Sequence, residues 1–138
     1  MAEDLTQRRQ GAKLTPNEAS KIAVDSALTV HRAYGPGLLE SAYEAMLAAE
    51  LTARKIAFRR QVIVPLRYRN QNLGEGFRAD LIVEDCLLIE LKSIEAVGPI
   101  HKKQVLTYLR LTGLKLGLLI NFGAQAIRDG TSRIVNGL

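Results

Sequence analysis

The sequence contains no tryptophan, a single cysteine and few aromatic residues, which make up 5% of its 138 residues. Cys86 therefore has no partner for an intramolecular disulfide and no set of ligands for a zinc site, and we interpret it as a small residue beside a turn. With so few aromatic rings, the chain shows no sign of a platform on which single-stranded bases could stack.

Long hydrophobic runs are also missing, since no segment approaches the roughly 20 apolar residues that cross a bilayer. Residues 1–4 lack the basic and then apolar pattern of a secretory signal. We therefore expect a cytoplasmic protein with no membrane partner. The length suits one domain, and the sequence shows no internal repeat and no low-complexity segment.

Positive charge is in excess, with 19 lysines and arginines against 14 aspartates and glutamates and a net charge of +5. An excess of this kind favours an anionic partner such as a nucleic acid. Many basic proteins bind no nucleic acid, so the charge permits this function without establishing it.

The chain begins with a polar segment and a clear helix start. Residues 1–14 carry no hydrophobic periodicity, so we expect a flexible arm ahead of one domain over residues 15–138. Thr15 has the properties of an N-cap, because proline follows it and Glu18 can close a capping box. The helix is predicted to end near Tyr34, where a Gly-Pro-Gly sequence stops it.

A second helix is predicted over residues 38–55, and it carries an acidic residue on its apolar stripe. Glu40 precedes Tyr43 and Leu47 on this stripe by three and seven residues. A carboxylate aimed at an apolar face needs a partner or a bound metal. The alternative is a first-turn glutamate that favours the helix dipole and points to solvent, and the residues leave both open.

Alternating residues after Ile56 predict a strand, which Pro65 places at an edge or a bulge of the sheet. Residues 70–76, rich in asparagine and glycine, are the predicted turn into the next strand. A third helix follows from Gly98-Pro99 to Gly113, and residues 114–122 form an apolar strand covered on both faces. The predicted class is α/β.

The most informative residues lie on two further strands that form a hairpin. Residues 77–83 and 87–91 alternate with period two around a three-residue turn, so that Val83 pairs with Leu87. Counting outward places Asp80 opposite Glu90.

Two opposed carboxylates repel each other and favour a cation between them, and Lys92 shares the face of Glu90. The pattern predicts a divalent-metal site suited to phosphoryl chemistry. The alternative is a surface ladder of ion pairs, which is weakened because Leu88 makes the same face partly apolar.

Other polar residues fall near this hairpin. His101, Gln104 and Tyr108 share one face of the third helix. His101 could serve as a proton carrier or contact a phosphate, but a local hydrogen bond at the helix start is the commoner role. Arg78 lies two residues before Asp80, where it could bridge to Glu40 or Glu90, contact a phosphate or form a structural ion pair.

The arrangement of Asp80 followed by Glu90-x-Lys92 in a strand hairpin resembles the PD-(D/E)XK nuclease-like superfamily. More narrowly, residues 37–43 resemble the signature of the GxxExxY family within it. The likeness covers most of the chain beyond the arm, namely residues 35–51, 76–94, 99–112 and 116–123.

The resemblance implies a restriction-endonuclease-like core, with a central mixed sheet of about four strands flanked by helices. It implies that Asp80 and Glu90 ligate one or two Mg²⁺ ions, for which Mn²⁺ can substitute, and that the Leu91 carbonyl completes the shell. Lys92 would orient the attacking water or stabilise charge on the phosphate. Glu40 would hold the metal through a water or assist the base.

The resemblance also extends to the third helix. Gln104 and Tyr108 match a Gln-x-x-x-Tyr element that positions the substrate backbone in the exonuclease-like branch. One departure is Ala79, which stands where many members carry proline before the aspartate.

The expected function is metal-dependent hydrolysis of nucleic acid phosphodiesters, with DNA favoured over RNA, and we expect a homodimer. One alternative is a non-catalytic nucleic-acid-binding or protein-interaction module that retains the fold. Another is hydrolysis of a different phosphate ester. No G-x-S-x-G nucleophile motif and no phosphate-binding loop with its lysine is present.

Overall fold

The computed structural model describes residues 13–138 of the protein. Residues 1–12 of the expected arm lie outside the described residues. Leu14, near the end of that segment, is buried and packs against the core. No helix among residues 13–138 is long and apolar enough to span a bilayer.

The first and third predicted helices begin where the sequence predicts, whereas the second is shorter than the predicted 38–55 and runs over Glu40–Ala53. At the start of the first, the Glu18 backbone N–H donates to the Thr15 hydroxyl (3.1 Å) and the Thr15 N–H donates to the Glu18 carboxylate (2.9 Å), which completes the capping box. Glycine at 113 adopts the left-handed conformation that ends the third predicted helix. The helices are α2 (Pro16–Tyr34), α3 (Glu40–Ala53), α4 (Pro99–Thr112) and the short α5 (Ile127–Gly130).

One mixed sheet of five strands forms the centre, in the order β1-β2-β3-β4-β5. The strands are β1 (Phe58–Tyr68), β2 (Gln71–Val83), β3 (Leu87–Lys92), β4 (Leu116–Asn121) and β5 (Thr131–Val135). β3 and β4 pair in parallel through the α4 crossover, and the other neighbours are antiparallel. This α/β arrangement confirms the predicted fold class and is consistent with a restriction-endonuclease-like core.

The sheet has one strand more than the predicted four or so. β5 is the additional strand, and α5 precedes it. Neither was predicted, because β5 is a short edge strand whose residues are half-buried or exposed and show little hydrophobic contrast.

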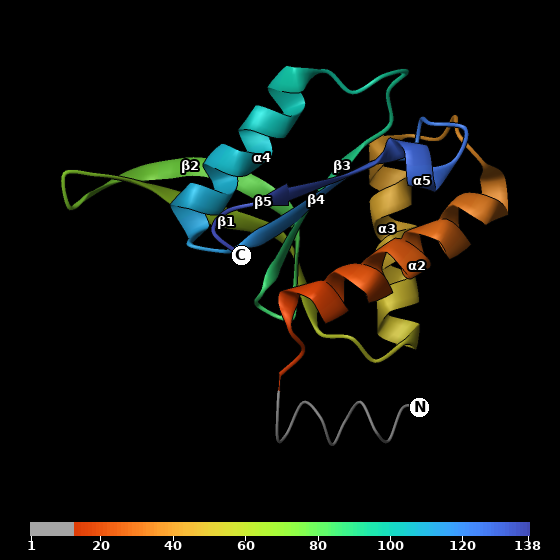
Figure 1. The fold of residues 1–138 in the computed structure, drawn as a ribbon, viewed down its shortest axis with the longest axis horizontal. Coiled ribbons are helices and arrows are strands. Elements are labelled where there is room, and N and C mark those ends of the chain that lie inside the picture. The colour runs from red at the N-terminus through yellow and green to blue at the C-terminus, as the bar shows by residue number, and fades with distance from the viewer. Residues whose placement is uncertain (1–12) are drawn as a thin grey trace.

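The helices cover both faces of the sheet (Figure 1). One core cluster joins α2 and α3 to one face, and the second joins α4 to the other. β4 lies between the two clusters and is buried over its whole length, as its apolar run predicts.

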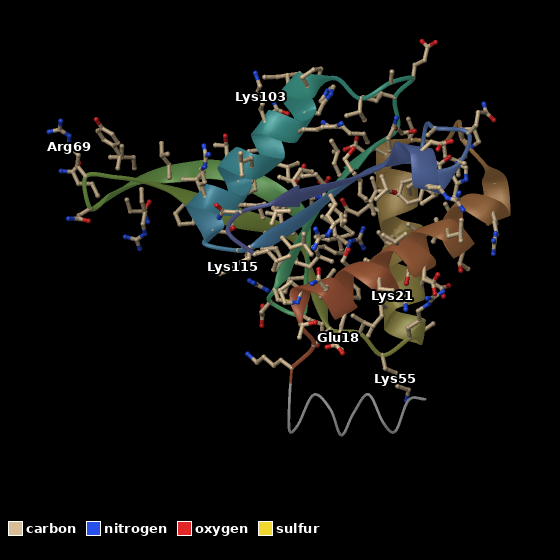
Figure 2. All side chains as sticks on the ribbon, in the orientation of Figure 1. Glu18, Lys21, Lys55, Arg69, Lys103 and Lys115 are labelled. Carbon is tan, nitrogen blue, oxygen red and sulfur yellow. The ribbon has the colours of Figure 1, made fainter. Side chains whose placement is uncertain are left out.

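The β1–β2 hairpin extends beyond the body of the domain, and Arg69 lies at its tip (Figures 1 and 2). Its turn is shorter than the predicted turn over residues 70–76. Arg69 and Asn70 alone make the turn, with φ of 52° and 61°, and β2 begins at Gln71. Pro65 interrupts the register of this edge strand, as predicted.

Asn121 fixes the chain where β3 leaves the sheet. Its side chain is 2% exposed, and its Oδ1 accepts hydrogen bonds from the N–H groups of Ile94 and Gly123, both at 3.0 Å. Its Nδ2 donates to the Ile94 carbonyl at 2.9 Å. The segment that follows Lys92 is therefore tied to the end of β4.

We expect Asn121→Ala to lower the free energy of unfolding by about 2–4 kcal/mol, because it leaves several backbone polar groups without partners. Urea-induced unfolding followed by circular dichroism measures the loss. Asn136→Ala is the matched control, since the Asn136 side chain donates one bond, to the Leu114 carbonyl at 3.1 Å. That control is expected to lose about 1 kcal/mol. Equal losses in the two variants would contradict the role given to Asn121.

Candidate active site

The β2–β3 hairpin has the predicted register. Val83 pairs with Leu87, and the ladder continues to Leu81 and Ile89. Beyond that pair, side chains take part in the contacts between the strands. The Asp80 N–H donates to Glu90 Oε1 at 3.2 Å, and the Leu91 N–H donates to Asp80 Oδ2 at 2.8 Å. The two carboxylates are therefore adjacent and are held by backbone groups.

The surroundings disfavour the charged forms of both carboxylates. Burial, and then the charge of Asp80, raise the pKa of Glu90 to about 8. Burial is also the first cause of the raised pKa of Asp80, which the hydrogen bond from the Leu91 N–H opposes. The charge of Lys92 lowers the pKa of each carboxyl without reversing its shift.

Glu40 belongs to the same electrostatic group, although it comes from α3. The residue as a whole is exposed, yet burial of its carboxyl is the first cause of its raised pKa, followed by the charge of Asp80. The charge of Lys92 lowers the pKa of Glu40. Glu40 is thus at the solvent-exposed end of the apolar stripe and close enough to sense the hairpin carboxylate.

Tyr43 sets the loop that precedes Glu40. Its hydroxyl donates to the Gly35 carbonyl and accepts a hydrogen bond from the Leu38 N–H at 3.1 Å. Its ring is fully buried and stacked on Phe122, with centroids 4.5 Å apart. The glycine at 37 has a φ of 117°, which disfavours any residue with a Cβ. The segment from 37 to 43 is therefore a structural unit that fixes the start of α3. The sequence suggests a place at the edge of the core for Tyr34 as well, and this expectation is wrong. Tyr34 is 70% exposed, because it lies at the end of α2.

On α4, Tyr108 lies beside the carboxylates. Its ring stacks on Phe77 with centroids 3.8 Å apart. Burial raises the pKa of Tyr108, and the charges of Glu90 and Asp80 raise it further. Gln104 is exposed one turn earlier on the same helix, and no contact in the structure joins its side chain to the carboxylates.

Two predicted residues have local partners. His101 Nδ1 accepts a hydrogen bond from the Gly98 N–H at 3.0 Å, which is the commoner role expected at a helix start. Arg78 pairs with Glu75 at 3.4 Å and not with Glu40 or Glu90. The bridge suggested by the sequence is therefore not formed, because a carboxylate three residues away along the strand is closer.

Sequence reasoning missed three residues next to Asp80. Glu44 is 7% exposed on α3, one turn after Glu40, and Arg60 Nε donates to its Oε2 at 3.0 Å. Gln61 Nε2 donates to Glu44 Oε1 at 2.6 Å and to Asp80 Oδ1 at 3.3 Å. The spacing of four from Glu40 could have indicated Glu44. Nothing in the periodicity indicates Gln61.

The donor set suits one kind of metal. Among residues 13–138, no group of three or more histidine, cysteine, aspartate or glutamate side chains is arranged to hold an ion. Asp80 and Glu90 provide two carboxylates, and carboxylates are hard oxygen ligands. Mg²⁺ is commonly held by one or two carboxylates and keeps several waters, whereas a structural zinc site needs four protein ligands. The pair therefore fits a Mg²⁺-type ion.

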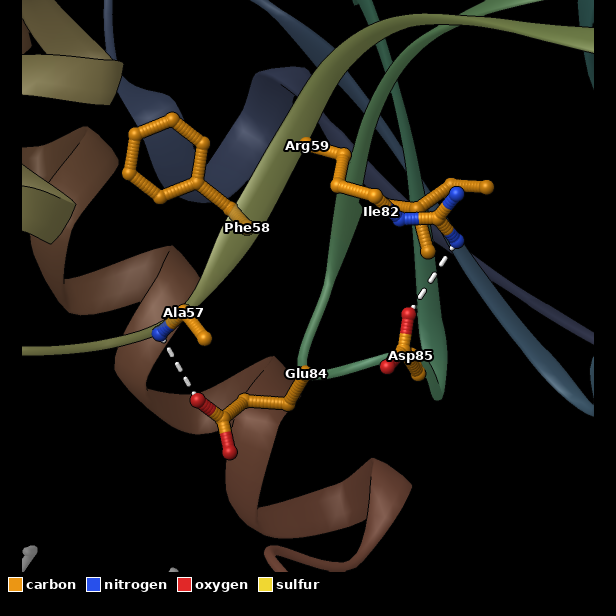
Figure 3. A pocket seen from close by; sticks show the side chains of 6 residues that line it. All are labelled: Ala57, Phe58, Arg59, Ile82, Glu84 and Asp85. Atoms are coloured by element: carbon orange, nitrogen blue, oxygen red, sulfur yellow. Dashed lines mark hydrogen bonds and ion pairs between the residues drawn. The ribbon is translucent and has the colours of Figure 1, made fainter.

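One groove in the described part of the chain adjoins this group. A groove of about 520 Å³ is lined by residues 36–39 and 93–95, which adjoin Glu40 and Lys92. A smaller pocket of about 140 Å³ lies beside the β2–β3 turn, and its charged groups are paired (Figure 3). There the Ala57 N–H donates to Glu84 at 2.7 Å and Arg59 pairs with Asp85 at 3.1 Å. None of the predicted site residues lines the smaller pocket.

A family model described as the PD-(D/E)XK nuclease superfamily matches residues 17–134. No curated protein and no solved structure matches the chain significantly. The matched range includes α2 to α4 and β1 to β4 almost entirely, and all residues of the site.

The raised pKa of Glu90 predicts a stability that depends on pH when no divalent ion is bound. The unfolded chain releases this proton near 4.5 and the folded protein near 8, so the free energy of unfolding is expected to fall as pH rises between these values. The expected fall is on the order of a few kcal/mol. Urea titrations in EDTA at pH 5, 7 and 8.5 measure it.

Glu90→Gln is expected to flatten this pH dependence and to raise the free energy of unfolding at pH 8.5. The matched control is Glu95→Gln, at an exposed position beyond β3, which should keep the wild-type slope. A wild-type slope in Glu90→Gln would show that Glu90 does not hold its proton in the folded protein.

Proposed function

The chain belongs to the PD-(D/E)XK nuclease superfamily, and from this we propose that it hydrolyses phosphodiester bonds of nucleic acids with the help of a divalent ion. The superfamily itself indicates a nuclease-type function. The observation that carries the proposal is the pair formed by Asp80 and Glu90, which are held against each other by the backbone of the hairpin with Lys92 close by.

The carboxylates would hold Mg²⁺, for which Mn²⁺ is a suitable substitute. A bound ion of this class neutralises charge on the phosphate and makes a water more acidic. The Asp80 and Glu90 carboxylates would supply two oxygen ligands. The backbone carbonyl of Leu91, which lies between Glu90 and Lys92 in the sequence, would supply a third. The repulsion between the Asp80 and Glu90 carboxylates explains why a cation is favoured between them.

Lys92 and Glu40 would act on the reacting groups. The Lys92 ammonium would stabilise negative charge that develops on the phosphoryl oxygens or orient the attacking water. Glu40, held at the start of α3, would accept a hydrogen bond from that water or assist its deprotonation. The charge of Lys92 lowers the pKa of Asp80, and the charge of Asp80 raises the pKa of Glu40, which supports a shared role.

The face of α4 would contact the substrate backbone. Tyr108 lies beside the carboxylates, and Gln104 is exposed one turn away. Arg78 and His101 remain candidates for phosphate contacts through the donors that their local bonds leave available. Lys103 on α4 and Arg69 on the hairpin tip project from the surface (Figure 2), as expected of a protein that binds a polyanion. We propose DNA before RNA as the substrate.

A second function from another class is favoured by one observation. Among residues 13–138, no group of three acidic, histidine or cysteine side chains is placed so that it would hold an ion, and this favours a binding module that keeps the fold and does not cut. Such a module would bind nucleic acid with a steep dependence on salt and would need no metal. The proposal also includes the narrower likeness to the GxxExxY family and a cytoplasmic location. It further includes a homodimer, which light scattering tests.

We expect the purified protein to degrade linear or nicked DNA with Mg²⁺ or Mn²⁺, and Asp80→Asn, Glu90→Gln or Lys92→Ala to lower the rate by about 100-fold or more. Release of a fluorescent end label measures the rate. Asp129→Asn on α5 is the matched control, since it removes one carboxylate from an exposed position outside the site. Equal activity in all variants would identify a contaminating nuclease.

We further expect calorimetry to detect Mn²⁺ binding that Asp80→Asn and Glu90→Gln each weaken by about tenfold or more. Binding is expected to tighten as pH rises toward about 8, because Glu90 must release its proton to act as a ligand. A protein that binds DNA but binds no Mn²⁺ at any pH would favour the binding module over the nuclease.

A further inference from the structure

Gln61 has a backbone conformation that is unusual for its place in the fold. It lies in the middle of β1, yet its φ is 50°, a left-handed value that residues with a Cβ rarely adopt inside a strand. The register places it opposite Asp80, between the pairs Arg60–Leu81 and Val62–Ala79. Conformations of this kind persist only where the surrounding structure enforces them, and they are common at functional sites.

The left-handed residue coincides with a change of face in both strands. Phe58 and its partner Val83 pack on the side of α2 and α3. Val62 and its partner Ala79 pack on the side of α4. Residues four apart in a regular strand point to the same face, so both strands must switch between these two pairs. Gln61 and Asp80 lie within that switch.

The side chain of Gln61 then joins two acidic groups. Its amide nitrogen is 2.6 Å from Glu44 Oε1 and 3.3 Å from Asp80 Oδ1. Both partners are carboxylates, which only accept hydrogen bonds, so the NH₂ end of the amide must face them. An NH₂ group has two hydrogens, one for each carboxylate. We call this arrangement of Gln61, Glu44 and Asp80 the carboxylate clamp.

The other bonds in the clamp leave Gln61 as the link between α3 and Asp80. Glu44 is nearly buried and is paired through its second oxygen with Arg60 at 3.0 Å. Asp80 receives the Leu91 N–H on Oδ2, so the amide of Gln61 fixes its other oxygen. With both oxygens oriented, the Asp80 carboxylate cannot rotate freely.

We propose that Gln61 is a positioning residue that orients the Asp80 carboxylate for the divalent ion and couples it to α3 through Glu44. This inference rests on the proposed function, because it assigns Asp80 to the ion. Hydrogen bonds that orient metal-binding carboxylates typically contribute 10–100-fold to metal affinity. The left-handed backbone is the conformation that directs the amide to Asp80.

Two variants separate the amide from the backbone. Gln61→Met has a side chain of similar length without donors, and it keeps a residue with a Cβ in the left-handed conformation. Gln61→Gly also lacks the donors but adopts this conformation at no steric cost. The control is Asn70→Gly at the hairpin tip, where φ is 61° and no site residue is near in the strand register.

We expect calorimetry on the full chain to show that Gln61→Met and Gln61→Gly both bind Mn²⁺ at least tenfold more weakly than the wild type, with Asn70→Gly unchanged. The melting temperature of Gln61→Gly should exceed that of Gln61→Met, because only the glycine relieves the left-handed conformation. If the two Gln61 variants lost Mn²⁺ affinity equally but differed in melting temperature, the loss of affinity would be due to the missing amide and not to the backbone. Wild-type affinity in both Gln61 variants would overturn the proposal.

A second measurement, made without metal, tests the role of Gln61 separately from the proposed function. The ¹³C resonance of the Asp80 carboxyl in metal-free protein should shift in Gln61→Met and stay in place in Asn70→Gly. If the wild type bound no Mn²⁺, the proposed metal chemistry would fail, and an unshifted Asp80 resonance in Gln61→Met would separately rule out the clamp.

Discussion

The contact between Asp80 and Glu90 is the constraint on which the rest of the site depends. Two carboxylates removed from water and placed side by side disfavour ionisation, and the fold holds them there with hydrogen bonds from its own backbone. The hairpin is anchored because Leu81 and Ile89 are fully buried in the core cluster on the side of α2 and α3. The burial of these core side chains therefore offsets the free-energy cost of holding two carboxylates side by side without a cation.

The two core clusters make this arrangement possible by meeting at one place in the sheet. β1 and β2 pack against α2 and α3 at one end and against α4 at the other, and Asp80 lies at the change between them. At this position Asp80 is within reach of side chains from the helices on both faces of the sheet. Glu40 approaches from α3 and Tyr108 from α4, and each senses the charge of Asp80. A regular strand would have presented Asp80 to one layer only.

Much of the fold and part of the site could be predicted, because they follow from local rules. The capping box at Thr15 and the pairing of Val83 with Leu87 depend on residues close in sequence, and both are confirmed. Gln61 could not be predicted, because its left-handed conformation results from tertiary contacts and leaves no periodicity. Of the roles left open for Arg78, the structure has an ion pair with Glu75, and its partner could not be predicted because same-face spacing does not say which of several carboxylates is nearest.

The interrupted register at Pro65 has a consequence for how the molecule behaves among its own copies. β1 is an edge strand, and unpaired N–H and C=O groups on such an edge can template strand addition that leads to fibrils. Proline removes one donor from the edge, and the register shifts on either side of it break the flat repeat that a newly arriving chain would have to match. The exposed arginine at 67 adds repulsion between like edges. The longest hairpin of the protein is thus protected against amyloid-like growth.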